Sequence, residues 1–250
     1  MVYKINLHQE IHGKLGVTFV LFCKDVGLGA ENTVYEILAA LENHPSLQSQ
    51  IVVVDDGSHE WQFDKQKFNN LDIDVVRLGT SKGISGAILE GTQIARHDNL
   101  FPIPGHDMYN ATAISNVLNL LNSADIILGC RSNLAVERPL LKRIASRVMR
   151  DLYRHFFFYY VGDVHGLISY RKRDVIKYLK NSDKHGQNIR IITNVISQGG
   201  LVVQTVAPIK SGHKLKRNVN FKNRYPNPQS TLHVIKLLIN LKLEMRKIHN

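Results

Sequence analysis

The sequence predicts an α/β domain built on a mostly parallel, doubly wound sheet with flanking helices. Two apolar runs without alternation, 17–23 and 51–54, are typical of strands buried on both faces of a parallel sheet. A helical pattern separates them, and a third strand is expected at 73–78, so that three strands fall within about 65 residues. This order of elements is the signature of a doubly wound parallel sheet.

The remaining elements follow in the same alternation. Asn32 or Thr33 is expected to cap the first helix, which ends at Leu41, and a glycine-rich loop at 79–87 leads into a helix that ends at Ala95. Further along, the patterns predict a proline-flanked strand at 99–104, a helix at 112–121, a strand at 125–129, a long helix at 139–160, a helix at 189–197 and a strand at 201–206. Residues 1–210 are therefore expected to form the main domain.

Composition places the chain among soluble globular proteins. Hydrophobic residues make up 44% and charged residues 21% of its 250 residues. Cys23 and Cys130 lie in apolar, strand-like segments, which indicates a reducing compartment without disulfides or thiolate metal sites. The first 16 residues are mostly polar, so no signal peptide is expected, and no apolar run approaches the roughly 20 residues of a membrane span. The expected location is the cytoplasm.

The positive charge is concentrated towards the carboxyl-terminal end. The net charge is +11, and residues 209–250 hold ten Lys or Arg residues and one acid, Glu244. Partners of such a segment are polyanions, anionic membrane surfaces or phosphorylated ligands. Nucleic acid is disfavoured, because Phe221 and Tyr225 are the only aromatic residues in the segment and no nucleic-acid-binding module is recognisable.

Residues 211–250 are expected to form a basic loop followed by an amphipathic helix that begins near Thr231. One face of this helix carries Val234, Leu238, Leu241, Met245 and Ile248. This face either packs on the domain or lies on an anionic membrane surface, which would make the protein peripheral at the cytoplasmic face of the membrane. The sequence leaves both arrangements open.

Two carboxylates stand where the second strand ends. Asp55, Asp56, Gly57 and Ser58 directly follow the apolar run. In an open α/β sheet, ligands bind outside the carboxyl ends of the strands, so Asp55 and Asp56 are expected at a ligand crevice. Formation of a tight turn is the alternative role of the same four residues.

Taken in order, the motifs resemble the family 2 glycosyltransferases with the GT-A fold, over roughly residues 15–215. More particular matches resemble the branch that transfers sugars to dolichyl or polyprenyl phosphate. They are residues 127–131, the basic helix with Ser146 and Arg147, Asp163 with Gly166, residues 170–172 and residues 206–209. The resemblance implies an inverting, hexosyltransferase-type enzyme that moves a sugar from a nucleotide-sugar donor to a lipid-linked acceptor.

The resemblance also implies which residues bind the donor. Asp25 and Asp56 would lie at the base and ribose of the nucleotide, with Asp55 beside them. Lys82 and Gly83, in the glycine-rich loop, would lie at the diphosphate.

On the acceptor side, the resemblance implies a basic site next to the sugar. Arg131 and either Lys142 or Arg143 would contact the acceptor phosphate. Asp163 would line the junction between sugar and acceptor, where it is the candidate base for a hydroxyl acceptor.

The metal-binding triplet departs from the family pattern. Asp107 corresponds to the last Asp of the Asp-x-Asp motif, but Gly105 stands at the first Asp and His106 in the middle. A Mg²⁺ or Mn²⁺ ion would then rest on one carboxylate and the nucleotide phosphates. His106 would favour Mn²⁺, because imidazole suits transition metals. Asp107 with its cation is expected to stabilise the leaving diphosphate, helped by Lys82 or by a basic group from the 210–217 loop (His213, Lys214).

Two other functions stay open at this point. A family 2 transferase of the same fold could add a sugar to a growing cell-surface polysaccharide. A degenerate member could bind nucleotide sugars without turnover, for which Gly105 in place of an aspartate is the supporting feature.

Overall fold

The structure, a computed structural model, describes residues 15–133, 140–157, 161–180, 186–210 and 228–249. The strands are β1 (Gly16–Cys23), β2 (Gln48–Asp55), β3 (Ile73–Arg77), β4 (Asn99–Pro104), β5 (Ile126–Cys130), β6 (Leu167–Arg171) and β7 (Val202–Val206). The helices are α1 (Gly29–Leu41), α2 (Gly83–Ile94), α3 (Ala111–Leu118), α5 (Leu140–Phe157), α6 (Lys172–Tyr178), α7 (Gln187–Ser197) and α8 (Pro228–His249), with a 3₁₀ turn, η1 (Lys65–Phe68).

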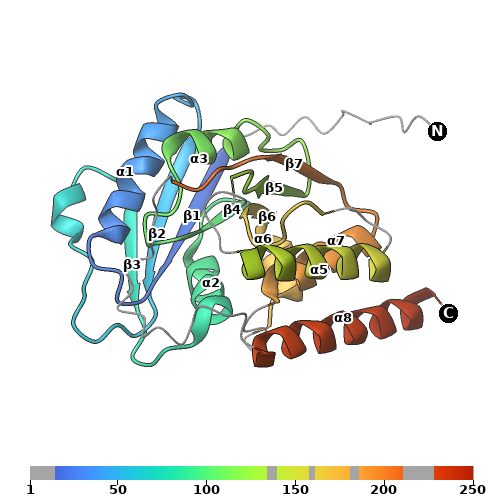
Figure 1. Ribbon diagram of the computed structural model, residues 1–250. Helices are drawn as coiled ribbons and strands as arrows, with labels where there is room; N and C mark the ends of the chain where they lie inside the picture. The colour runs from blue at the N-terminus through green and yellow to red at the C-terminus, as the bar shows by residue number, and fades with distance from the viewer. Residues whose placement is uncertain (1–14, 134–139, 158–160, 181–185, 211–227, 250) are drawn as a thin grey trace.

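The strands form one seven-stranded sheet in the order β3-β2-β1-β4-β6-β5-β7 (Figure 1). β6 runs antiparallel to β4 and β5, and the other neighbouring strands are parallel. The predicted α/β fold with a mostly parallel sheet and flanking helices is confirmed. Because β1, β2 and β3 are adjacent and parallel, the loops that follow them meet at one edge of the sheet.

Helices cover both faces of the sheet, which explains why its central strands lack alternation. On one face, Val17, Phe19 and Leu21 pack against α1 and α3. On the other face, Val20, Val52 and Val54 pack against α2, and β4, β5 and β6 pack against α5, α6, α7 and α8. Both faces of β1 are therefore buried, as its continuous apolar run predicts.

Four elements, α1, α6, β6 and η1, differ from the sequence prediction, which contained neither the strand β6 nor the turn η1. Helix α1 begins at Gly29 with Leu28 as its N-cap residue and without a side-chain cap, so the predicted caps Asn32 and Thr33 are wrong. Both lie inside the helix, and the Thr33 hydroxyl donates to the carbonyl of Gly29 at 2.7 Å. The short helix α6 was not predicted, because its seven residues are too few to show a clear period.

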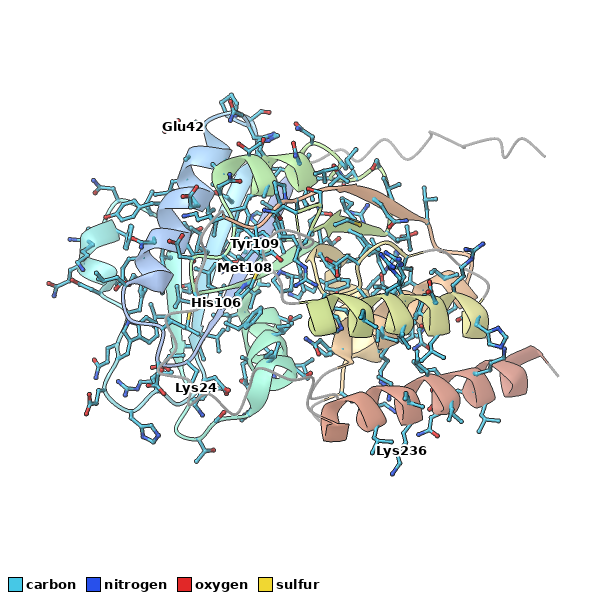
Figure 2. All side chains as sticks on the ribbon, in the orientation of Figure 1. Lys24, Glu42, His106, Met108, Tyr109 and Lys236 are labelled. Atoms are coloured by element: carbon cyan, nitrogen blue, oxygen red, sulfur yellow. The ribbon has the colours of Figure 1, made fainter. Side chains whose placement is uncertain are left out.

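Helix α8 packs on the domain. Leu237, Leu238 and Leu241 are buried in the second core, and Gly186 leaves space for Leu237, because an added Cβ would lie 2.1 Å from Leu237 Cδ2. Lys236, on another face, points away from the domain (Figure 2). The side chains of Val234, Met245 and Ile248 lie outside the described residues. Residues 211–227 lie outside them too, so the division at residue 210 stays a prediction. None of the described helices is both long and apolar enough to cross a membrane.

Candidate active site

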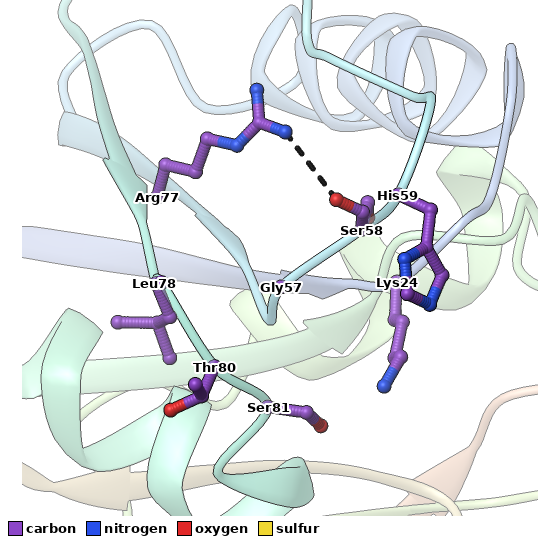
Figure 3. A pocket seen from close by; sticks show the side chains of 9 residues that line it. Lys24, Gly57, Ser58, His59, Arg77, Leu78, Thr80 and Ser81 are labelled. Carbon is purple, nitrogen blue, oxygen red and sulfur yellow. Dashed lines mark hydrogen bonds between the residues drawn. The ribbon is translucent and has the colours of Figure 1, made fainter.

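A pocket of about 540 Å³ lies at the carboxyl ends of β1, β2 and β3. The loops that follow these three strands line it, together with the last residue of β3 (Figure 3). The lining residues are Lys24, Gly57, Ser58, His59, Arg77, Leu78, Gly79, Thr80 and Ser81. Gly57 adopts a φ of 70°, and a Cβ there would lie 2.9 Å from the backbone nitrogen of Ser81. The pocket occupies the place where the sequence predicts a ligand crevice, and Lys24 and Arg77 give its walls positive charge.

Asp25 and Asp55 hold the loops that line this pocket. Asp25 Oδ1 accepts a hydrogen bond from the backbone N–H of His59 (2.9 Å), and the Asp25 N–H donates to Ser58 Oγ (2.8 Å). Asp55 Oδ1 accepts from the backbone N–H of Ser58 (2.9 Å). Its buried Oδ2 lies 3.5 Å from Arg77 Nε without hydrogen-bond geometry. Asp55 therefore takes part in the turn, and the nucleotide contacts of both aspartates stay predictions.

The carboxylate of Asp56 binds the amino-terminal end of α2. It accepts hydrogen bonds from the backbone N–H groups of Lys82 (2.6 Å) and Gly83 (3.0 Å). The Ser81 hydroxyl also donates to it, at 2.7 Å. The helix dipole stabilises a negative charge at this position. Lys82 Nζ pairs with Glu90 Oε1 at 2.5 Å. Lys82 and Gly83, which the resemblance places at the diphosphate, thus have hydrogen-bond or ion-pair partners within the protein. Their contact with a nucleotide stays a prediction.

Gly105 is buried beside the thiol of Cys23, where β4 and β1 end. A Cβ atom at position 105 would lie 2.2 Å from Cys23 Sγ. Burial raises the pKa of the Cys23 thiol well above its ordinary value, and the nearby carboxylates of Asp55 and Glu31 raise it further. This position therefore offers neither the space nor the charge environment for the first aspartate of an Asp-x-Asp triplet.

Asp107 belongs to a group of three charged side chains, Glu36, Asp107 and Lys210, called here the Lys210 cluster. Lys210 Nζ contacts Asp107 Oδ1 and, at 2.6 Å, Glu36 Oε1. Glu36 Oε2 accepts from the backbone N–H of Ala111 (2.6 Å), and the Asp107 N–H donates to Thr33 Oγ1 (3.1 Å). Burial lowers the pKa of Lys210, but its hydrogen bonds with the two carboxylates outweigh this effect and raise the pKa above its ordinary value. Lys210 is therefore a cation at neutral pH.

These residues do not fit the predicted metal site as they stand. The carboxylate of Asp107 already forms an ion pair with Lys210, and Gly105 has no side chain that could bind a metal ion. In the part of the chain that the structure describes, no group of three or more His, Cys, Asp and Glu side chains could hold a metal ion. His106, half-buried near Met108 (Figure 2), already interacts within the protein. Metal binding by Asp107 and His106 stays a prediction, and it requires the ion pair between Lys210 and Asp107 to break.

Arg131 and Asp163 form a buried, bidentate ion pair. Nε and Nη2 of Arg131 donate to Oδ2 and Oδ1 of Asp163 at 2.6 and 2.7 Å. The two side chains are 5% and 11% exposed. Burial alone raises the pKa of Asp163, but the hydrogen bonds and charge of Arg131 more than offset it, so the pKa lies below its ordinary value. The structure thus brings together two residues predicted at the acceptor side and pairs them with each other.

The remaining predicted acceptor residues, Lys142 and Arg143, lie in α5, and their side chains are outside the described residues. The sequence patterns did not single out four charged residues that the structure places at the site, although one of them belongs to the 210–217 loop that was expected to supply a basic group. They are Lys24, Glu36, Arg77 and Lys210. Lys24, Arg77 and Lys210 lie at or within a few residues after the ends of strands, and this position in the sequence could have indicated a role at the site. Glu36 lies within a helix, and no sequence pattern indicates that it belongs to the site.

A family model for glycosyl transferase family 2 matches residues 26–180, more than half of the chain. The chain belongs to glycosyl transferase family 2. This confirms the family that the sequence motifs resemble, and it identifies the protein as a glycosyltransferase. No match was found among curated protein sequences.

Three solved glycosyltransferases illustrate how far the likeness in structure extends. Mannosyl-3-phosphoglycerate synthase from Rubrobacter xylanophilus is 16% identical with a TM-score of 0.68, over 93% of this chain and 75% of that one. Glucosyl-3-phosphoglycerate synthase from Mycobacterium tuberculosis, in complex with Mn²⁺, UDP-glucose and glycerol 3-phosphate, is 12% identical (TM-score 0.62, 92% and 80%). The mannosyltransferase PcManGT from Pyrobaculum calidifontis, in complex with GDP-Man and Mn²⁺, is 11% identical (TM-score 0.54, 77% and 55%). At such identities the likeness establishes the GT-A fold.

Proposed function

We propose that this family 2 glycosyltransferase moves a sugar from a nucleotide-sugar donor to a phosphate-bearing acceptor of the polyprenyl-phosphate class, with inversion at the anomeric carbon. The pocket of about 540 Å³ at the carboxyl ends of β1, β2 and β3 is the observation that supports donor binding. Ligands bind at this edge in open α/β sheets, and pockets for small ligands measure roughly 300–1,000 Å³. Two of the similar structures are complexes with nucleotide sugars.

The reaction displaces a nucleoside diphosphate from the anomeric carbon of the sugar. Negative charge develops on the leaving phosphate, so cationic groups must face it in the transition state. Lys24 and Arg77 line the pocket, and Lys210 lies beside Asp107. Mn²⁺ is present in two of the similar structures, but in this chain Lys210 is paired with the Asp107 carboxylate that would bind it.

The Arg131–Asp163 pair favours an acceptor that arrives as an anion. Both oxygens of Asp163 accept hydrogen bonds from Arg131, and its lowered pKa makes it a weak proton acceptor. A hydroxyl acceptor needs such a base, whereas a phosphate is already ionised and needs only orientation. A guanidinium suits a phosphate ligand, but Nε and Nη2 of Arg131 are engaged by Asp163, so its contact with an acceptor phosphate requires this pair to open.

Thermal unfolding in the presence of UDP, GDP, CDP and ADP tests donor binding. At a concentration of 100 times the dissociation constant, the matching nucleotide is expected to stabilise the protein by about 2.7 kcal/mol. For a chain of this size the unfolding temperature then rises by roughly 5–10 °C. Thr80→Trp, which fills the pocket, is expected to abolish this rise in unfolding temperature. The control Thr112→Trp, at an exposed position on α3, is expected to show the same rise as the wild type. A rise that survives in Thr80→Trp would place nucleotide binding elsewhere.

The outer face of α8 supports a lipid-linked acceptor. Leu232, Ile239 and Leu243 are 57%, 43% and 51% exposed. Lys236 lies between them at helical spacing, so the four side chains share one face. A helix face that combines exposed apolar residues with lysine suits the surface of an anionic membrane.

Co-sedimentation with phosphatidylglycerol-containing vesicles tests this membrane contact. Replacing the three apolar residues of the outer face with glutamine is expected to weaken vesicle binding by about tenfold or more, since each buried aliphatic side chain contributes roughly 1.5–3 kcal/mol. The control is Ile176→Gln, because Ile176 is 61% exposed on α6. Equal binding by the triple variant and the wild type would exclude α8 as the membrane-facing element.

A further inference from the structure

The position beside Asp107 already holds a positive charge. Lys210 Nζ contacts the carboxylates of both Asp107 and Glu36, and the side chains of the cluster are 25–27% exposed. The ammonium offsets the charge of one of these two carboxylates, and the cluster lies just after the end of β4, outside the residues that line the pocket. The resemblance of the sequence motifs implies a divalent ion at Asp107, but Gly105, which packs against Cys23, supplies no first aspartate for it.

The backbone holds Lys210 in this position. Its own N–H donates to the carbonyl of Met108 at 2.9 Å, and Ile209 bridges to Tyr109 in antiparallel fashion. The Asn133 side chain makes two further hydrogen bonds with the backbone of Ile209, donating at 2.7 Å and accepting at 3.0 Å. The main chain of Ile209 and Lys210 is therefore held beside Met108 and Tyr109, and the two carboxylates hold the Lys210 ammonium next to Asp107.

We propose that the ammonium group of Lys210 takes the place of the divalent cation at Asp107, so that this transferase binds its nucleoside diphosphate without a metal ion. The proposal rests on the donor binding inferred above. An ammonium has three N–H donors, and the two carboxylates use two of them, which leaves one for a diphosphate oxygen. Glu36 helps to keep the lysine in place, because its Oε2 accepts from the backbone N–H of Ala111 at the start of α3 while its Oε1 contacts the ammonium.

The alternative is that the Lys210–Asp107 ion pair exists only in the metal-free protein, and that a metal ion displaces Lys210 when it binds Asp107. The two arrangements predict opposite effects of metal on nucleotide binding. If Lys210 replaces the metal, removing the lysine weakens the nucleotide complex and exposes two carboxylates that can then bind Mn²⁺. If Lys210 is displaced by metal, the wild type binds nucleotide only when metal is present.

Calorimetric titration of the metal-free, full-length protein with UDP and GDP distinguishes these arrangements. We expect the wild type to bind one of them with the same dissociation constant in chelator and in Mn²⁺. Lys210→Met should weaken binding in chelator by about tenfold or more, as the loss of one charge-assisted hydrogen bond does, and Lys210→Arg should retain most of the affinity. The matched control is Lys177→Met, on α6 and outside the pocket.

Binding of Mn²⁺ to the protein alone, followed by electron paramagnetic resonance, gives a second readout that needs no nucleotide. Lys210→Met is expected to bind Mn²⁺ through Asp107 and Glu36, and the wild type is not; thermal unfolding confirms that each variant folds. Nucleotide binding that requires Mn²⁺ in the wild type, or wild-type Mn²⁺ binding that Asp107→Asn abolishes, would overturn the proposal. If neither UDP nor GDP binds, donor binding by these nucleotides fails, and the Mn²⁺ readout still decides the role of Lys210.

Discussion

Replacing Asp163 with alanine is expected to lower the free energy of unfolding by about 3–5 kcal/mol, because it leaves the guanidinium of Arg131 buried without a counter-ion. The side chain of Arg131 is 5% exposed, so water cannot replace the lost carboxylate. Urea denaturation at pH 7 measures the loss. The matched control is Asp72→Ala, which breaks the exposed Arg96–Asp72 pair and is expected to cost no more than about 1 kcal/mol.

The double variant Arg131→Met/Asp163→Leu separates the ion pair from packing. A buried ion pair replaced by apolar side chains of similar volume is often neutral in stability. We therefore expect the double variant to be more stable than Asp163→Ala and to lose transferase activity. A double variant as unstable as the single one would mean that packing around Asp163, rather than its charge, accounts for the loss.

The same pair gives the protein an acid-sensitive component of stability. The pKa of Asp163 is lowered in the folded protein, so between the two pKa values the unfolded state binds more protons. The contribution is fully present above the ordinary pKa of about 3.9 and is lost as the pH falls through the lower folded value. The difference in unfolding free energy between wild type and Asp163→Asn should therefore shrink below about pH 4.

Restoring the missing aspartate by Gly105→Asp is expected to destabilise the protein strongly. The new Cβ would meet Cys23 Sγ at 2.2 Å, and overpacking of a core typically costs about 1–3 kcal/mol. The new carboxylate would also be buried near Asp55 and Glu31, without a described positive partner, which adds to the cost. Thermal or urea unfolding measures the combined effect.

Gly79→Asp is the control, because nothing lies within 4 Å of a Cβ at that position. Adding Cys23→Ala to Gly105→Asp removes the sulfur and is expected to recover part of the lost stability. If Gly105→Asp proves as stable as Gly79→Asp, the space beside Cys23 is not what keeps the first aspartate of the triplet out of this chain.

The sequence alone determined the α/β class, six of the seven strands and the family. The unalternating apolar runs of β1 and β2 required burial on both faces, and the carboxylates after β2 pointed to the edge at which the pocket lies. These are local patterns, in which each signal lies within a few residues along the chain. The start of α1 was mispredicted for a local reason too, because Thr33 bonds to a carbonyl inside the helix instead of capping it.

Only the tertiary structure decided what the charged residues do. Asp56 binds the end of α2, Asp163 binds Arg131, and Asp107 binds a lysine that lies 103 positions further along the chain. Ion pairs form between whichever charges the fold brings together, and their separation in sequence carries no pattern from which a partner can be read. The same holds for Gly105, whose missing side chain is explained by Cys23 on the neighbouring strand.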